Sequence, residues 1–135
     1  MKLVAREAET QALTDWLRER PIRMTSILSK VEVLRAVRRV ANATEDAGLI
    51  RQASDVLASV AITGLTPGVA DRAAMADPPT LRSLDAVHLA TAVLAAPLEA
   101  FVVYDDRLAE AARAAGITVV QPGREPNDAG AVDAR

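Results

Sequence analysis

The chain contains no cysteine and a single histidine, His88. Without cysteine it has no disulfide framework, no thiol nucleophile and none of the thiolate ligands of structural zinc, a composition that fits a reducing compartment. One histidine excludes sites that need two imidazoles, whether for acid–base exchange or for a metal. Chemistry in this chain must therefore depend on carboxylates, hydroxyls or arginines.

Aromatic residues make up only 2% of the chain, and the net charge at pH 7 is −2. So few aromatic side chains exclude a stacking platform for single-stranded bases. The weak negative charge excludes a general basic field for nucleic acid. The N-terminus becomes charged too soon for a signal peptide, and the longest apolar stretch, residues 84–94, is too short to span a bilayer. We therefore expect a cytoplasmic protein without a membrane segment.

With 135 residues, half of them hydrophobic, the chain is long enough for one domain with its own core and too short for two. We expect this domain to cover residues 1–120. Residues 121–135 are rich in Pro, Gly, Asn, Asp and Ala and are predicted to be a disordered tail.

Helical and strand periodicities alternate along the chain. Helices are expected at residues 3–17, 27–41, 44–59, 66–77, 83–96 and 106–115, and short apolar strands at 24–25, 60–63, 100–104 and 117–120. Ser26 and either Asp105 or Asp106 are suited to cap helices. The alternation predicts an α/β fold in which helices surround a small parallel sheet. The strand at 100–104 has the continuous apolar character of a strand buried on both faces.

Three acidic residues stand next to apolar positions. Glu32 is flanked by valines, Asp85 lies in the first turn of the most hydrophobic predicted helix, and Asp105 directly follows the strand at 100–104. In an open parallel sheet, ligands bind beyond the carboxyl ends of the strands. These positions make Glu32, Asp85 and Asp105 the candidates for a functional site.

Each of these acids also has a purely structural explanation. Glu32 can form an ion pair on the flank of its own helix. Asp85 is favoured near a helix N-terminus by the macrodipole, and Asp105 can serve as an N-cap and nothing more. The basic neighbours available to Glu32 are Lys30, Arg35 and Arg39.

Taken together, the three acids favour a metal site, because carboxylates that converge repel one another unless a cation lies between them. All-oxygen ligands suit Mg²⁺ or Mn²⁺. Such an ion lowers the pKa of a bound water and stabilises phosphoryl charge. Four further residues are candidates for supporting roles beside the acids: Thr25, Ser26, His88 and Asp106.

Arg35, Arg38 and Arg39 form a basic edge on the helix that carries Glu32. Two interpretations are open for them. They are a solvated helix face, or they contact the phosphates of RNA.

Three segments resemble the acidic motifs of PIN-domain ribonucleases, specifically the VapC toxins. Residues 25–36 (TSILSKVEVLRA) resemble the second motif, residues 81–90 (LRSLDAVHLA) the third and most specific, and residues 101–108 (FVVYDDRL) the fourth. Their order and spacing also agree with the family, and the resemblance covers about Leu3 to Val120.

The resemblance implies a three-layer α/β/α fold and an endoribonuclease that uses Mg²⁺ or Mn²⁺ to hydrolyse RNA phosphodiester bonds. It implies that Glu32, Asp85 and Asp105 are the catalytic acids that hold the metal. It also implies a homodimer that is neutralised by a cognate VapB-type antitoxin.

The chain departs from the family pattern at its N-terminus. The family has a short strand ending in a first acidic residue before the helix that resembles residues 3–10, whereas Met1-Lys2 joins this helix directly. Glu7 and Glu9 are poor substitutes, because they lie further along the helix. One interpretation is a gene start placed too far downstream, so that the protein is a complete nuclease. The other is a weakened or inactive homologue that binds an antitoxin or a partner subunit, and a metal-free α/β scaffold is a third possibility.

Overall fold

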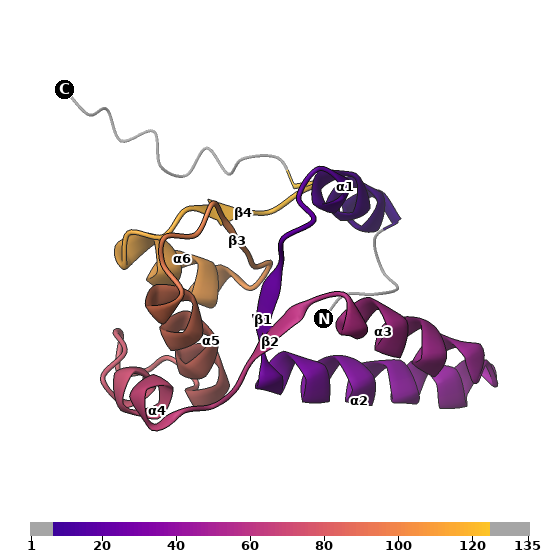
Figure 1. Cartoon of the computed structure of the whole chain (residues 1–135), viewed down its shortest axis with the longest axis horizontal. Helices are drawn as coiled ribbons and strands as arrows, with labels where there is room; N and C mark the ends of the chain where they lie inside the picture. Colours follow the sequence, from indigo (N-terminus) through magenta and orange to yellow (C-terminus); the bar gives the residue numbers. More distant parts are fainter. Residues whose placement is uncertain (1–6, 125–135) are drawn as a thin grey trace.

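The structure is a computed structural model that describes the backbone of residues 7–124 and the side chains of residues 11–124 (Figure 1). The expected helix start at Leu3 and the side chains of Glu7 and Glu9 lie outside the described residues. The elements follow in the order α1 (Glu7–Arg18), β1 (Met24–Ser26), α2 (Ile27–Thr44), α3 (Gly48–Ala58), β2 (Ala61–Thr63), α4 (Pro67–Ala74), α5 (Ser83–Leu94), β3 (Phe101–Val102), α6 (Asp106–Ala114) and β4 (Val119–Val120). This alternation confirms the predicted α/β class.

Several helices begin where the sequence predicts. Ser26 accepts a hydrogen bond from the backbone N–H of Leu28 at 3.2 Å and caps α2. Thr66 caps α4 ahead of Pro67, and Asp105, rather than Asp106, caps α6. Each oxygen takes up a backbone N–H that has no partner inside the helix, so local sequence alone sets these three boundaries.

The boundary between α2 and α3 differs from the prediction. A break was expected at 42–44 and a new helix from Thr44, but α2 continues through Thr44 and α3 begins at Gly48. Thr44 donates its hydroxyl to the carbonyl of Val40 at 2.7 Å, which lets it remain in the last turn. The helix ends at Glu45, whose φ of 56° is left-handed and whose N–H bonds to the carbonyl of Ala41.

The strands pair in parallel, as expected, but two by two. Within residues 7–124, β1 pairs with β2 in the register Met24 to Ala61, and β3 pairs with β4 in the register Phe101 to Val119. The strand expected at 100–104 is shorter and less covered than predicted, because only Phe101–Val102 pair and both are partly exposed. The carbonyl of Val103 bonds to the side chain of Gln121 instead of to another strand.

Helices cover the strands from two sides (Figure 1). α2 and α3 pack against each other on one side of the β1–β2 pair, and α4, α5 and α6 lie on the other. A buried core cluster joins α5, α6 and the residue after β3, and it consists of Leu89, Val103, Leu108, Ala109, Ala111 and Ala112. Since most of these side chains are small, α5 and α6 can pack closely against each other.

Arg20, just after α1, links the N-terminal helix to the loop before β3. Its Nε lies 3.0 Å from Glu99 Oε1, its NH1 donates to the carbonyl of Trp16, and its guanidinium carbon lies 4.1 Å from the centroid of the Trp16 ring. These contacts connect parts of the chain that are 79 residues apart. They hold the end of α1 next to the loop that precedes β3.

The chain continues in an ordered way past β4. Gln121 donates to the carbonyl of Val103, and Tyr104 donates its hydroxyl to the carbonyl of Pro122 at 2.7 Å. The expected boundary between 120 and 121 stays a prediction, and residues 125–135 lie outside the described part. None of the helices within residues 7–124 is long and apolar enough to cross a membrane.

Candidate active site

A contact between α2 and α5 forms one side of the candidate site. His88 donates from Nε2 to Oε1 of Glu32 at 2.8 Å, and the two side chains are 15% and 48% exposed. The carboxylate can only accept, so this contact fixes the proton on Nε2. The alternative pairing of Glu32 with Lys30, Arg35 or Arg39 does not occur among the described side chains, since Glu32 pairs with His88 instead.

Asp85 lies one turn before His88 on the same face of α5. Burial raises the pKa of Asp85 above its ordinary value of 3.8, and the nearby carboxylate of Asp105 raises it further. His88 and Arg82 lower this pKa, and Glu32 adds a smaller increase. Both other candidate acids therefore influence the charge of Asp85, and Asp105 does so more strongly than Glu32.

Asp105 reaches the site from the end of β3. Its Oδ1 accepts the N–H of Leu108 at 2.9 Å, which is the predicted capping role. The cap uses one carboxylate oxygen and leaves the second for another ligand. Since the side chain is also exposed, the structural and functional interpretations of Asp105 are compatible.

The four supporting candidates have different surroundings. His88 contacts Glu32 directly. Ser26 is buried and its hydroxyl accepts a hydrogen bond in the cap of α2, and Thr25 is paired in β1. Asp106 is exposed and faces Arg124, whose NH1 lies 3.4 Å from its Oδ1.

Two contributions to this region were missed by sequence reasoning. Arg82, the residue just before α5, lowers the pKa of Asp85. Its position three residues before an acid in the first turn of a helix could have indicated this interaction. Arg124 donates to the carbonyl of Tyr104 at 2.8 Å and so holds the backbone just before Asp105. Nothing in a segment expected to be a tail indicated that role.

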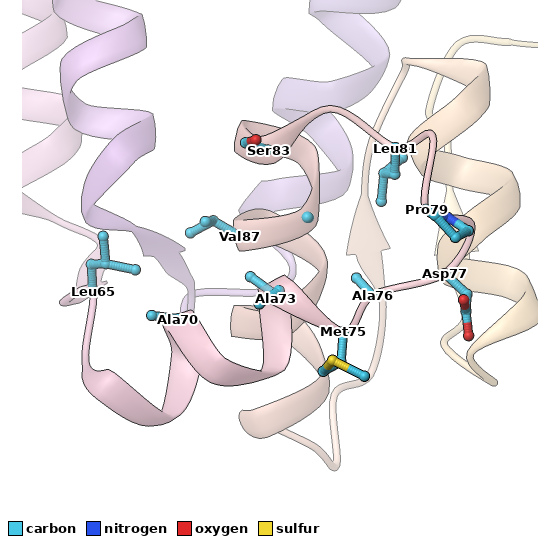
Figure 2. Close-up of a pocket in the computed structure, with 12 residues that line it drawn as sticks. Leu65, Ala70, Ala73, Met75, Ala76, Asp77, Pro79, Leu81, Ser83 and Val87 are labelled. Carbon is cyan, nitrogen blue, oxygen red and sulfur yellow. The ribbon is translucent and has the colours of Figure 1, made fainter.

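A hollow elsewhere on the molecule does not include the candidate acids. It lies between α4, the following loop and α5, and its lining includes Met75, Ala76, Leu81, Ser83 and Val87 (Figure 2). Ser83 and Val87 each stand two residues from Asp85, which at 100° per residue places them on the opposite face of α5. The hollow is therefore separate from the acidic site.

The acids suit a hard divalent cation, though not a closed protein cage. No group of three or more His, Asp or Glu side chains within the described part of the chain is arranged to hold a metal ion. Mg²⁺ commonly takes only one or two carboxylates and keeps several waters. Asp85 and Asp105 fit that demand, because the charge of Asp105 raises the pKa of Asp85 and a cation would relieve this repulsion.

The model of the PIN domain matches residues 1–114 of this chain. The chain belongs to the PIN-domain family. Its relatives place it in the VapC group. Ribonuclease VapC35 of Mycobacterium tuberculosis is 45% identical over 129 residues, covering 92% of each chain. Ribonuclease VapC46 of the same organism is 39% identical over 123 residues, covering 90% of this chain and 91% of the relative.

A third relative, ribonuclease VapC47 of M. tuberculosis, is 38% identical over 127 residues, covering 90% of each chain. No solved structure gives a significant match. The family expected from the three acidic motifs is thereby confirmed, and so is the PIN-like α/β fold class.

Proposed function

We propose that this chain is the toxin component of a VapBC-type toxin–antitoxin system and hydrolyses RNA phosphodiester bonds with the help of Mg²⁺ or Mn²⁺. The observation that carries the proposal is the 2.8 Å contact between His88 and Glu32, which joins α2 to the helix that carries Asp85. The raised pKa of Asp85, to which Asp105 and Glu32 contribute, supports it. The relatives, which are named as ribonucleases, support the reaction class.

In this proposal Asp85 and Asp105 hold the cation, and Glu32 completes the acidic rim. The cation would make water more acidic and offset charge on the phosphate. His88 keeps Oε1 of Glu32 in place and leaves Oε2 for the metal, its water shell or the RNA. Hydrolysis forms one P–O bond to water and breaks another. The water loses a proton, and the departing ribose oxygen gains one.

The test is cleavage of RNA by the purified chain with Mn²⁺, compared with the same chain in EDTA. Cleavage that requires the cation and scales with protein concentration supports the proposal. Absence of cleavage under both conditions, with the protein folded by circular dichroism, contradicts it.

A second candidate function is a PIN homologue that binds an antitoxin or a partner subunit without cutting RNA. It is favoured by the lack, among the described side chains, of a group of three metal-ligating residues. The two functions differ in one measurement. The binding module forms complexes without turnover at any Mn²⁺ concentration, whereas the nuclease turns over.

The proposed partners are an RNA substrate, a VapB-type antitoxin and a second copy of this chain, all in the cytoplasm. Exposed apolar side chains, among them Ile22, Val56 and Met75, are available for protein contacts. The mass of the purified chain by light scattering tests the homodimer. A monomer at micromolar concentration would contradict it.

A further inference from the structure

Three arginines on the outer face of α2 have no partner in the described part of the chain. Arg35, Arg38 and Arg39 are exposed, and no ion pair or hydrogen bond within that part involves their side chains. An exposed arginine is normally tolerated anywhere, but three within five residues form a local positive charge on a chain whose net charge is −2.

The helical spacing aligns this charge with the acidic site. At 100° per residue, Arg35 and Arg39 fall on the same face of α2 as Glu32, and Arg38 flanks them. The opposite face contains Val37 and Ala41, which are 6% and 4% exposed. The arginines therefore point away from the core.

Arg35, Arg38 and Arg39 form a row, called the arginine row below, that begins near Glu32 and leads away from the acidic site along α2. α2 starts at β1 and extends outward past the end of the strand (Figure 1). Glu32, which contacts His88 on the helix that carries Asp85, stands about 10 Å along the helix axis from Arg39. That length corresponds to roughly three nucleotides at the ~3.4 Å rise of a stacked strand.

The positive charges of Arg35, Arg38 and Arg39 are not neutralised by acidic side chains of the same helix. Glu32 is the acid on this face of α2, and its Oε1 is bound by His88. Guanidinium groups donate two parallel hydrogen bonds to phosphate oxygens, a geometry that suits a nucleic-acid backbone.

We propose that Arg35, Arg38 and Arg39 bind the sugar–phosphate backbone of the RNA on one side of the cleaved bond. The strand then runs along the outer face of α2, away from Asp85 and Asp105. This inference rests on the proposed function for its substrate. It assigns the substrate path to particular side chains, and it resolves the two interpretations of the basic edge in favour of phosphate contact.

The experiment measures binding of a short, fluorescein-labelled single-stranded RNA by anisotropy in EDTA, where the proposed cleavage is off. The variant is R35Q/R38Q/R39Q. Its matched control is R18Q/R72Q/R113Q, which removes the same charge from exposed positions on α1, α4 and α6. The conservative variant R35K/R38K/R39K keeps the charge, so it separates an effect of charge from damage to the helix.

We expect the α2 glutamine variant to bind roughly tenfold more weakly or worse, and the control to bind like the unmodified chain. The plot of log affinity against log salt should become shallower by about 0.7 for each phosphate that the variant no longer neutralises. The lysine variant should retain that slope. In a cleavage assay with Mn²⁺, the glutamine variant should raise KM while kcat is retained.

Two results would overturn the inference. One is an equal drop in affinity in the α2 variant and its control, and the other is an unchanged salt slope in the α2 variant. A role for these arginines in binding an acidic protein partner would give the second of these results, because RNA binding and its salt slope would be unchanged. A different result is RNA binding that depends on these arginines while the unmodified chain cleaves no RNA. It would contradict the proposed nuclease function but support the proposed binding of RNA along α2.

Discussion

His88 and Glu32 are 56 residues apart in the sequence and 2.8 Å apart in the structure. This one contact joins α5, which carries Asp85, to α2, which carries the arginine row. Neither residue is fully buried, so packing alone does not hold them together. We regard His88 as a positioning residue that acts through the carboxylate of Glu32.

Replacing His88 by Ala should weaken Mn²⁺ binding and RNA cleavage by about 10–100-fold, because partners that orient acidic groups near a metal have effects of that size. His88→Gln should recover part of this activity, since its amide can donate to Glu32 from a similar position. The measurement is Mn²⁺ titration by calorimetry alongside initial cleavage rates.

The control for that experiment is a double-mutant cycle with Glu32→Gln. If His88 acts through Glu32, the second substitution adds little once the first is present. Strictly additive decreases in metal affinity would show that the two side chains act separately.

Asp85→Asn should reduce RNA cleavage by roughly 10²–10³-fold, the effect expected when several kcal/mol of charge stabilisation are removed. The substitution keeps the size of the side chain, so the fold should be retained. Cleavage rates at saturating Mn²⁺, with circular dichroism of the same samples, check this. Asp71→Asn on the exposed surface of α4 is the matched control and should cleave normally.

The pKa of Asp85 also predicts how stability depends on pH. Because burial raises this pKa in the folded protein above 3.8, the folded state still binds the proton at pH values where the unfolded chain has released it. Stability contributed by Asp85 therefore increases as pH falls through the folded-state pKa towards 3.8, and decreases as pH rises through the same window.

Urea unfolding of the unmodified chain and of Asp85→Asn in EDTA isolates this contribution. The difference in free energy of unfolding should favour Asn at neutral pH and shrink as the pH approaches 3.8. A difference that is independent of pH between about 3.8 and 7 would contradict a raised pKa at this position.

The parts of the fold that depend on local chemistry could be predicted from the sequence. The caps at Ser26 and Asp105 are satisfied within three residues, so spacing is sufficient to find them. The end of α2 could not be found in this way, because it depends on Glu45 taking a left-handed conformation that its side chain does not favour.

The candidate site shows the same division. Glu32, Asp85 and Asp105 stood out because carboxylates beside apolar residues need an explanation. The sequence did not indicate that Glu32 pairs with His88, because a contact between two helices depends on how the helices cross. A neighbour one turn away, such as Arg35, was the natural partner to expect from the sequence.

Arg20 should stabilise the fold by more than its ion pair with the exposed Glu99 alone would contribute. Arg20→Ala removes the stacking on Trp16 and two hydrogen bonds at a mostly covered side chain, and should lower the free energy of unfolding by about 1–2 kcal/mol. Glu99→Gln should cost less than about 1 kcal/mol, because its carboxylate is 71% exposed. Urea unfolding of both variants compares them, and equal decreases would mean that the ion pair dominates.

Gln121 should belong to the folded domain, one residue beyond the boundary expected from composition. Its side chain donates at 2.9 Å to the carbonyl of Val103, a residue that is only 8% exposed. Gln121→Ala leaves that carbonyl without this donor and should lower the free energy of unfolding by about 1–2 kcal/mol. Gln52→Ala, on the exposed side of α3, is the matched control and should change stability by less than about 0.5 kcal/mol.

Equal stabilities of the two variants in urea would place the boundary of the cooperative unit at 120. A selective decrease for Gln121→Ala would show that the segment after β4 supports the backbone that positions Asp105.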